Sequence, residues 1–143
     1  MKFFFIKISI VFLGLVPFSF SNESNNLTFV VLSDIHIYTS GRIPPKAKAV
    51  IQHIKNIRPD LVFITGDHTN GNRGDNAQAS TIKKWYNSLD TLLSPLIESN
   101  IPIFPTVGNH DYYERPHKTA YQNWAKKIIS KSFNLLEINQ PKN

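Results

Sequence analysis

Short apolar runs alternate with longer amphipathic segments along this chain. Three runs rich in β-branched and aromatic residues, 27–32, 61–64 and 102–107, have the composition of buried strands. After each run, apolar residues recur at the three- and four-residue spacing of a helix face. These helix-face residues are Ala47, Val50, Ile51, Ile54 and Ile57, then Ile82, Trp85, Tyr86, Leu89, Leu92, Leu93 and Leu96, then Tyr121, Trp124, Ala125, Ile128 and Ile129. A weaker run at 133–138 predicts a fourth strand.

Prolines mark where the predicted helices begin and end. Pro44 and Pro45 precede the first helix, Pro59 follows its end, and Pro95 is expected to kink or end the second. The resulting order is strand, helix, strand, helix, strand. This order predicts an α/β fold, a βαβαβ parallel-type sheet with right-handed crossovers and flanking helices.

The first 21 residues have the pattern of a secretory signal peptide. Lys2 and Lys7 form a short basic start, residues 8–18 are uncharged and mostly apolar, and small residues occupy positions 19 and 21. We expect cleavage after Ser21, with an uncleaved membrane anchor as the alternative. Either way the remainder is expected to be exported, to the periplasm or outside the cell, and to meet a membrane only during export. Residues 22–26 are predicted to be a flexible lead-in, and 27–143 the domain.

Composition narrows the classes of protein that the chain can belong to. It is 41% hydrophobic and 18% charged, as in globular proteins. It has no cysteine, which excludes disulfide scaffolds, thiol nucleophiles and thiolate metal sites. The net charge of +6 falls to +4 without residues 1–21, and no run of basic residues interleaves with aromatic ones. Nucleic acid is therefore not expected as the main partner.

Polar residues with metal-binding chemistry follow each of the three strands. Asp34 and His36 follow the first strand, Asp67 the second, and the segment 109–111 the third. Because the carboxyl ends of parallel strands line one edge of a sheet, we expect these side chains to meet there. We also expect Asp34 and His36, two apart in extended chain, to share a face. Oxygen and imidazole donors without sulfur suit manganese, iron or zinc, and two such ions can clamp a phosphoryl group.

Three motifs together resemble those of the calcineurin-like metallophosphoesterase superfamily. The family pattern is Asp-x-His, then Gly-Asp, then Gly-Asn-His-Asp/Glu, and here it reads 34–36, 66–67 and 108–111. The resemblance implies a fold like one half of the family's αββα sandwich. It also implies hydrolysis of a phosphomonoester or phosphodiester substrate by a metal-bound hydroxide, with two divalent metal ions of manganese, iron or zinc.

The resemblance carries metal-binding roles to four positions. Asp34 and His36 would bind the first ion, Asp67 would bridge both ions, and Asn109 would bind the second.

Catalytic and substrate-binding roles are carried to positions near these ligands. His110 would protonate the leaving alkoxide or stabilise charge on the phosphoryl group, and Asp111 would orient His110. His68 is a candidate to reach the metal site or substrate, or else a solvated loop residue. Tyr112 and Arg115 are candidates to line the substrate pocket, with ordinary loop packing as the alternative.

The sequence departs from the family pattern after Asp111. The family's later motifs, a lone His and a Gly-His-x-His, are absent, and His117 is expected at the surface. The chain is therefore expected to be truncated, to hydrolyse phosphoesters poorly alone, and to self-associate through an uncovered apolar sheet face. The alternative is a non-catalytic exported α/β domain that binds at most one metal ion or a protein partner.

Overall fold

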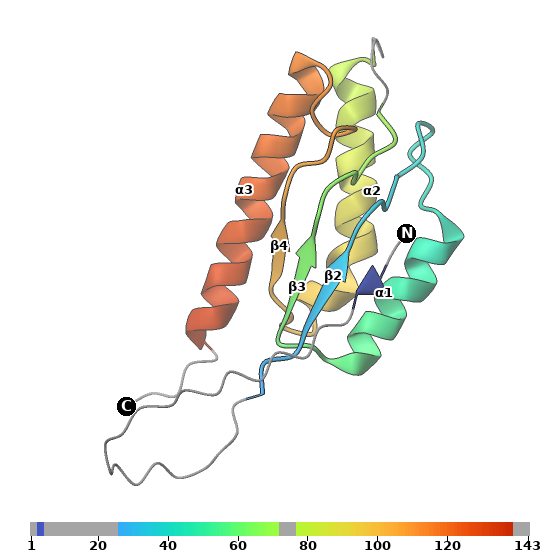
Figure 1. Cartoon of the computed structure of the whole chain (residues 1–143). Coiled ribbons are helices and arrows are strands. Elements are labelled where there is room, and N and C mark those ends of the chain that lie inside the picture. Colours follow the sequence, from blue (N-terminus) through green and yellow to red (C-terminus); the bar gives the residue numbers. More distant parts are fainter. Residues whose placement is uncertain (1–2, 5–25, 72–76, 139–143) are drawn as a thin grey trace, which may run out of the picture.

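Strands and helices alternate along the chain as the sequence predicts (Figure 1). The computed structural model describes residues 3–4, 26–71 and 77–138. Its main elements are β2 (Phe29–Leu32), α1 (Pro45–Ile57), β3 (Leu61–Ile64), α2 (Ala79–Ile97), β4 (Ile103–Pro105) and α3 (Arg115–Ile138). Apart from β1 (Phe3–Phe4), which pairs antiparallel with β2, the predicted signal peptide lies outside the described residues.

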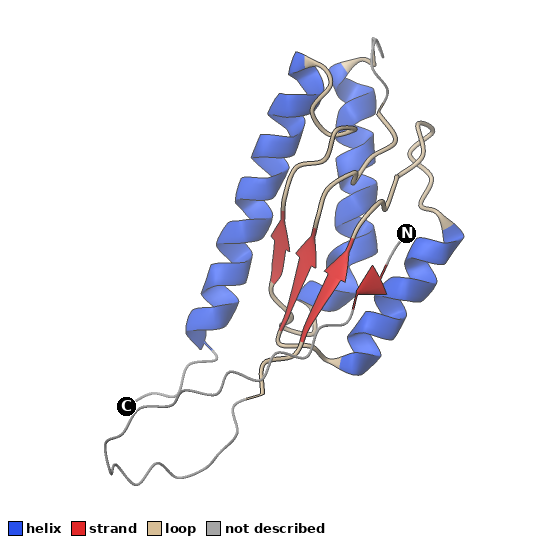
Figure 2. Ribbon diagram, in the orientation of Figure 1, coloured by secondary structure: helices blue, strands red, loops and turns tan. Residues whose placement is uncertain are grey.

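Strands β2, β3 and β4 form a parallel sheet, with the helices behind and beside it (Figure 2). β2 pairs with β3 and β3 pairs with β4, all parallel, and Phe63 lies opposite both Val31 and Phe104. Parallel neighbours need a crossover, and here each crossover contains a helix. The predicted α/β class, consistent with half of a metallophosphoesterase sandwich, is confirmed.

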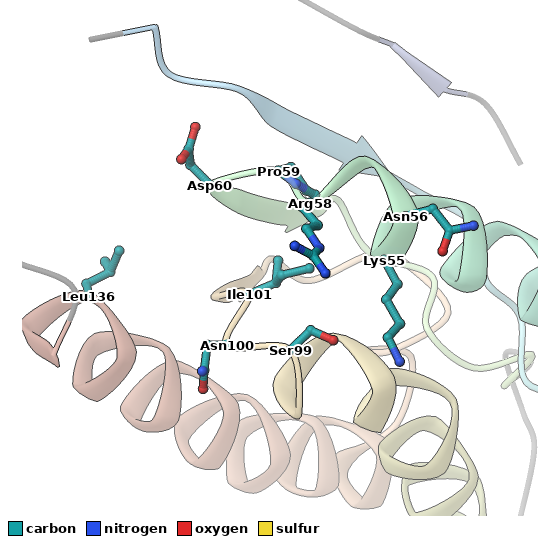
Figure 3. A pocket seen from close by; sticks show the side chains of 9 residues that line it. All are labelled: Lys55, Asn56, Arg58, Pro59, Asp60, Ser99, Asn100, Ile101 and Leu136. Carbon is teal, nitrogen blue, oxygen red and sulfur yellow. The ribbon is translucent and has the colours of Figure 1, made fainter. Parts of the chain in front are cut away.

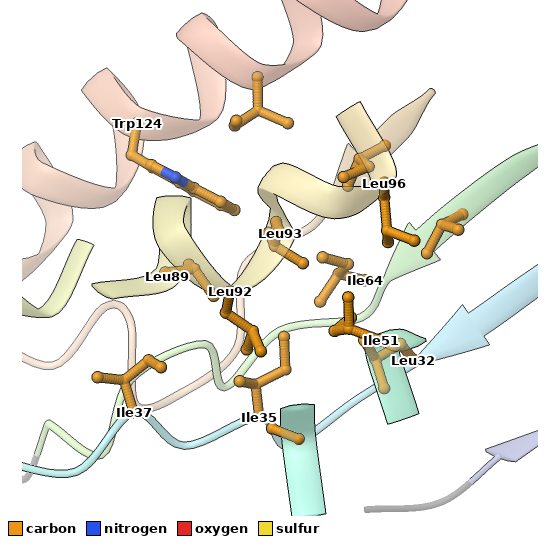
Figure 4. Close-up of a cluster of buried hydrophobic side chains, with 14 of the residues drawn as sticks. Leu32, Ile35, Ile37, Ile51, Ile64, Leu89, Leu92, Leu93, Leu96 and Trp124 are labelled. Atoms are coloured by element: carbon orange, nitrogen blue, oxygen red, sulfur yellow. The ribbon is translucent and has the colours of Figure 1, made fainter. Parts of the chain in front are cut away.

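One face of the sheet is packed against the helices (Figure 4). Alternate strand residues such as Leu32 and Ile64 point into this core, where they meet Ile51 of α1 and Leu93 of α2. Trp85 of α2 is almost fully buried beside them. Truncating a buried tryptophan to alanine typically costs about 3–5 kcal/mol, so this face contributes much of the stability.

The opposite face of the sheet presents three phenylalanines, and Phe133 of α3 continues their row. Phe29, Phe63, Phe104 and Phe133 follow one another, with ring centroids separated by 5.8, 6.1 and 5.6 Å. Phe63 is 37% exposed and Phe133 is 54% exposed. This row lies on the apolar face through which the sequence predicts self-association. Self-association remains a prediction.

The predicted strand at 133–138 is wrong, because α3 continues without a break to Ile138. The hydroxyl of Ser132 accepts a hydrogen bond from the backbone N–H of Ile103 (2.8 Å) and donates to its carbonyl (2.7 Å). These bonds tie the helix to the edge strand β4, and the ring of Phe133 packs on Phe104. The apolar residues of this segment therefore belong to a helix that covers the edge of the sheet at β4.

No helix within residues 3–4, 26–71 and 77–138 is both long enough and apolar enough to cross a membrane.

Candidate metal centre

The loop after β2 carries Asp34 and His36 in an unusual backbone conformation. The prediction of extended chain is wrong, since both residues adopt left-handed φ angles, 57° and 51°. The two side chains nevertheless lie together, with Asp34 Oδ1 3.6 Å from His36 Nε2. Ile35 and Ile37 between and beyond them are buried in the core. Burial of the two isoleucines holds Asp34 and His36 at the edge of the core.

The loop after β3 is bonded to the loop after β2 along its length. The backbone N–H of His36 donates to the Asp67 carbonyl, and that of Ile37 donates to the His68 carbonyl, both at 3.0 Å. Asp67 is also left-handed, with φ 54°. Such a conformation costs a non-glycine residue about 1–2 kcal/mol and persists where the surroundings hold it in place.

Two glycines allow the loop after β4 to approach Asp67 closely. A Cβ on Gly66 would lie 2.4 Å from backbone atoms of Gly108, and a Cβ on Gly108 would lie 2.2 Å from the Asp67 nitrogen. Only glycine fits at either position. This close approach lets the backbone N–H of His110 donate to Asp67 Oδ1 at 3.0 Å.

Side chains from the three loops converge at the carboxyl end of the sheet. His36, Asp67 and His110 each offer a ligand atom, and these atoms all lie within 4.8 Å of one another. The two imidazole rings stand nearly perpendicular, at 88°, with centroids 4.9 Å apart. Asp34 adjoins this group through His36, and Asn109 precedes His110 in the chain. Asn109 also donates through its amide to the Tyr113 hydroxyl.

His110 is oriented by a backbone carbonyl. Its Nδ1 bonds the carbonyl oxygen of Gly71, which can only accept, so Nδ1 carries the proton and Nε2 is left for the site. The prediction that Asp111 orients His110 is wrong for this reason. A carbonyl oxygen has no signature in a sequence, so Gly71 could not be found from residue types.

Asp111 lies beneath the site rather than in it. Its carboxylate is fully buried and accepts hydrogen bonds from the His68 ring and from backbone N–H groups. Burial alone would raise the pKa of Asp111, but the hydrogen bonds and charge of His68 and the N–H of Gly108 outweigh it and lower the pKa. Burial and this negative charge also raise the pKa of Tyr121 to about 12.

Two histidines occupy different places from those predicted. His68 is fully buried, so both its substrate-binding role and the alternative of a solvated loop residue are wrong. His117 is only 2% exposed, and its ring stacks on Trp85 at 5.8 Å. Position 117 falls one helical turn before Tyr121 on the buried face of α3. Extending that periodicity backwards would have identified His117 as buried.

The residues predicted to line the substrate pocket, Tyr112 and Arg115, lie in different surroundings. Tyr112 is exposed and lies under the Lys118 ammonium, 4.7 Å from its ring centroid. Arg115 lines a groove of about 650 Å³ between α2 and α3. Tyr113, rather than Tyr112, contacts the site, with its ring 5.3 Å from that of His110.

The residues of this centre fit a divalent cation. Two imidazoles and a carboxylate from three separate loops offer nitrogen and oxygen donors, a set that suits manganese, iron or zinc. His36 Nδ1 is buried without a hydrogen-bond partner among the described residues. The strained backbone at Asp34, His36 and Asp67 has no other evident use.

Comparison with known proteins agrees with this geometry. The family model for calcineurin-like phosphoesterases matches residues 27–142. The chain belongs to the calcineurin-like phosphoesterase family. The resemblance seen in the three motifs is thus confirmed, and the family is one of hydrolases.

Two curated proteins are similar to parts of this phosphoesterase chain. A probable cyclic nucleotide phosphodiesterase of Moraxella catarrhalis is 35% identical over 95 residues, covering 63% of this chain and 30% of that protein. An uncharacterised protein of Schizosaccharomyces pombe is 27% identical over 105 residues, covering 62% of this chain and 19% of that protein. The matched region therefore spans less than a third of the length of either relative.

Proposed function

We propose that this protein is a divalent-metal-dependent phosphoesterase and that the carboxyl-end loops hold its metal ions. The convergence of His36, Asp67 and His110 within 4.8 Å carries this proposal. Of these, His36 and Asp67 are the proposed ligands, together with Asp34 beside His36 and Asn109 beside His110, and His110 is the proposed proton donor. We propose two ions of manganese, iron or zinc, with further ligands supplied from outside these 143 residues. The short share of each relative that the chain matches supports this last point.

The residues of the chain can assist phosphoester hydrolysis in specific ways. Divalent ions, when bound, activate water for attack and neutralise charge on the phosphoryl oxygens. In the reaction a water oxygen bonds to phosphorus and the ester P–O bond breaks. His110, with Nδ1–H fixed on the Gly71 carbonyl, presents Nε2 to the site and, when protonated, gives its proton to the leaving oxygen.

A phosphodiester is the substrate class to test first. The Moraxella catarrhalis relative is named as a probable cyclic nucleotide phosphodiesterase. That name describes the relative, and it supports a diester in preference to a monoester as the substrate of this protein.

Metal binding gives the first test of the proposal. Asp67→Asn removes a charged ligand, whereas Asp60→Asn changes a carboxylate at the opposite end of the sheet. We expect the full chain to bind Mn²⁺ in calorimetry, Asp67→Asn to bind at least tenfold more weakly, and Asp60→Asn to bind like the wild type. No Mn²⁺ binding, or equal binding by Asp67→Asn, would contradict the proposed site.

Hydrolysis of an aryl phosphodiester and an aryl phosphomonoester, with Mn²⁺ or Zn²⁺ added, tests the activity. We expect the 143-residue chain to turn over slowly, because ligands from one part of the site leave the second ion under-coordinated. Robust turnover abolished by Asp67→Asn would show that the chain is sufficient by itself. Mn²⁺ binding without turnover, even in the longest natural form of the protein, would favour a non-catalytic metal-binding domain.

We also propose that the protein is exported after removal of residues 1–21. The basic start, apolar run and small residues at positions 19 and 21 support this proposal. Mass spectrometry of the mature protein tests it. A chain beginning at Asn22 is expected, and an intact Met1 would contradict cleavage.

A further inference from the structure

One buried carboxylate joins the loops that follow β3 and β4. Asp111 Oδ1 accepts from the backbone N–H groups of His68 (3.0 Å) and Thr69 (3.3 Å). Its Oδ2 accepts from the His68 ring at Nδ1 (2.7 Å) and from the N–H of Gly108 (3.1 Å). Asp111 belongs to the loop after β4, and three of its four donors belong to the loop after β3.

These donors lie directly beside the residues of the metal centre. His68 follows Asp67 in the chain, and Gly108 is separated from His110 only by Asn109. The carboxylate of Asp111 therefore fixes the distance between the backbone of Asp67 and that of His110. The direct hydrogen bond from the His110 N–H to Asp67 Oδ1 depends on that distance.

The loop after β3 also carries the group that orients His110. Gly71 lies three residues after His68, and its carbonyl holds His110 Nδ1. Beneath this loop, the His68 ring packs against Tyr121 and Trp124 of α3, with centroids 5.6 and 4.9 Å away. Movement of His68 would thus displace Asp67, which precedes it in the chain. It would also move the Gly71 carbonyl and so change the orientation of His110.

We propose that Asp111 and His68 form a positioning pair for the metal centre, an inference that rests on the function proposed above. Both side chains are 0% exposed, and neither belongs to the group of His36, Asp67 and His110 whose ligand atoms converge. They act by holding the β3 loop against the β4 loop, so that His36, Asp67 and His110 converge without rearrangement. Residues that support metal ligands in this way typically change metal affinity 10- to 100-fold when they are replaced.

Substitutions at His68 can separate positioning from simple packing. The side-chain amide of asparagine can place an N–H near the position of Nδ1, whereas leucine has similar apolar bulk but no donor. His68→Asn should therefore preserve the bond to Asp111, and His68→Leu should lose it. Ser132→Ala is the matched control, because it removes buried hydrogen bonds to Ile103 at the far side of β4.

Amide hydrogen exchange of the full chain without metal tests the pair directly. We expect the N–H groups of His68, Gly108 and His110 to exchange slowly in the wild type and in His68→Asn. We expect exchange at His110 to accelerate at least tenfold in His68→Leu but not in Ser132→Ala. Fast exchange at these amides in the wild type would overturn the pair even if no variant folds.

Mn²⁺ affinity, measured where each variant is fully folded, tests the consequence for the site. The affinity of His68→Leu should fall at least tenfold, while His68→Asn and Ser132→Ala should stay within about threefold of the wild type. Unchanged affinity in a folded His68→Leu would overturn the positioning role. Absence of Mn²⁺ binding by the wild type would instead overturn the proposed function, and hydrogen exchange would still decide whether the pair holds the loops.

Discussion

The two ends of the sheet differ in how their polar residues are arranged. The amino end opens into a cavity of about 1010 Å³, lined by Lys55, Arg58, Asp60 and neighbouring residues (Figure 3). Asp60 there accepts a hydrogen bond from the backbone N–H of Thr28 at 2.7 Å, which joins the chain segments that lead into β2 and β3. At the carboxyl end the polar groups instead point at one another, within 4.8 Å. Convergence of side chains, not the size of a cavity, distinguishes the end of the sheet that carries the candidate metal centre.

Left-handed residues occur at both ends, for different reasons. At the amino end, Arg58 caps α1 by donating its N–H to the Ile54 carbonyl, and Asn100 follows the end of α2. A left-handed residue is a normal way to end a helix. Asp34 and Asp67 at the carboxyl end follow strands, where no helix end requires this conformation. Backbone strain there is explained by the positions that their side chains must take.

The largest difference between the two ends is expected from alanine substitution. Gly108→Ala would place a Cβ 2.2 Å from the Asp67 nitrogen, and backbone cannot move aside cheaply. We expect a loss of about 3 kcal/mol or more in the free energy of unfolding. Asn100→Ala, at a left-handed position of the amino end, should lose only about 1 kcal/mol. Urea unfolding of both variants measures this, and equal losses would contradict the close contact.

Acid should lower the stability of the carboxyl end of the sheet through protonation of Asp111. The pKa of Asp111 is lowered in the folded state by its hydrogen bonds, so its contribution to stability is complete above the unfolded pKa of about 4. That contribution is lost as pH falls through the folded pKa. In metal-free buffer, the free energy of unfolding of the wild type should fall more steeply below pH 4 than that of Asp111→Asn. Parallel curves would show that Asp111 is not stabilised as the anion.

A smaller effect should appear when strain is released at either end. Arg58→Gly and His36→Gly each replace a left-handed residue, and each should gain about 0.5–1 kcal/mol in the free energy of unfolding. Only His36→Gly should lose Mn²⁺ affinity, because only the carboxyl end uses its strain for binding. A loss of stability in both variants, measured in urea, would show that neither backbone is strained.

The fold was largely predictable because its strands and helices have strong periodicity. The three strands, the helix face from Ile82 to Leu96 and the end of α1 at Arg58 all follow local rules. The structure of the segment that begins at Phe133 was not predicted correctly, because its apolar residues fit either a strand or a helix. Packing of Ser132 on Ile103 decides for the helix, and such a long-range contact has no local signature.

The candidate site was predictable in position but not in its hydrogen bonds. The strand-end rule correctly brings Asp67 to the same edge as His36. The partners of Asp111 and His110 depend on how the β3 loop folds back, which sets the places of His68 and the Gly71 carbonyl. Neither partner could be inferred from spacing, since both hydrogen bonds span about forty residues of sequence.

The most direct test of the metal centre is an NMR titration of the full chain with paramagnetic Mn²⁺. The ring signals of His36 and His110 should broaden at the lowest additions of metal. Those of His53, exposed on α1, should broaden only later. Uniform broadening of all histidines, or earlier broadening of His53, would contradict a specific metal centre at the carboxyl end of the sheet.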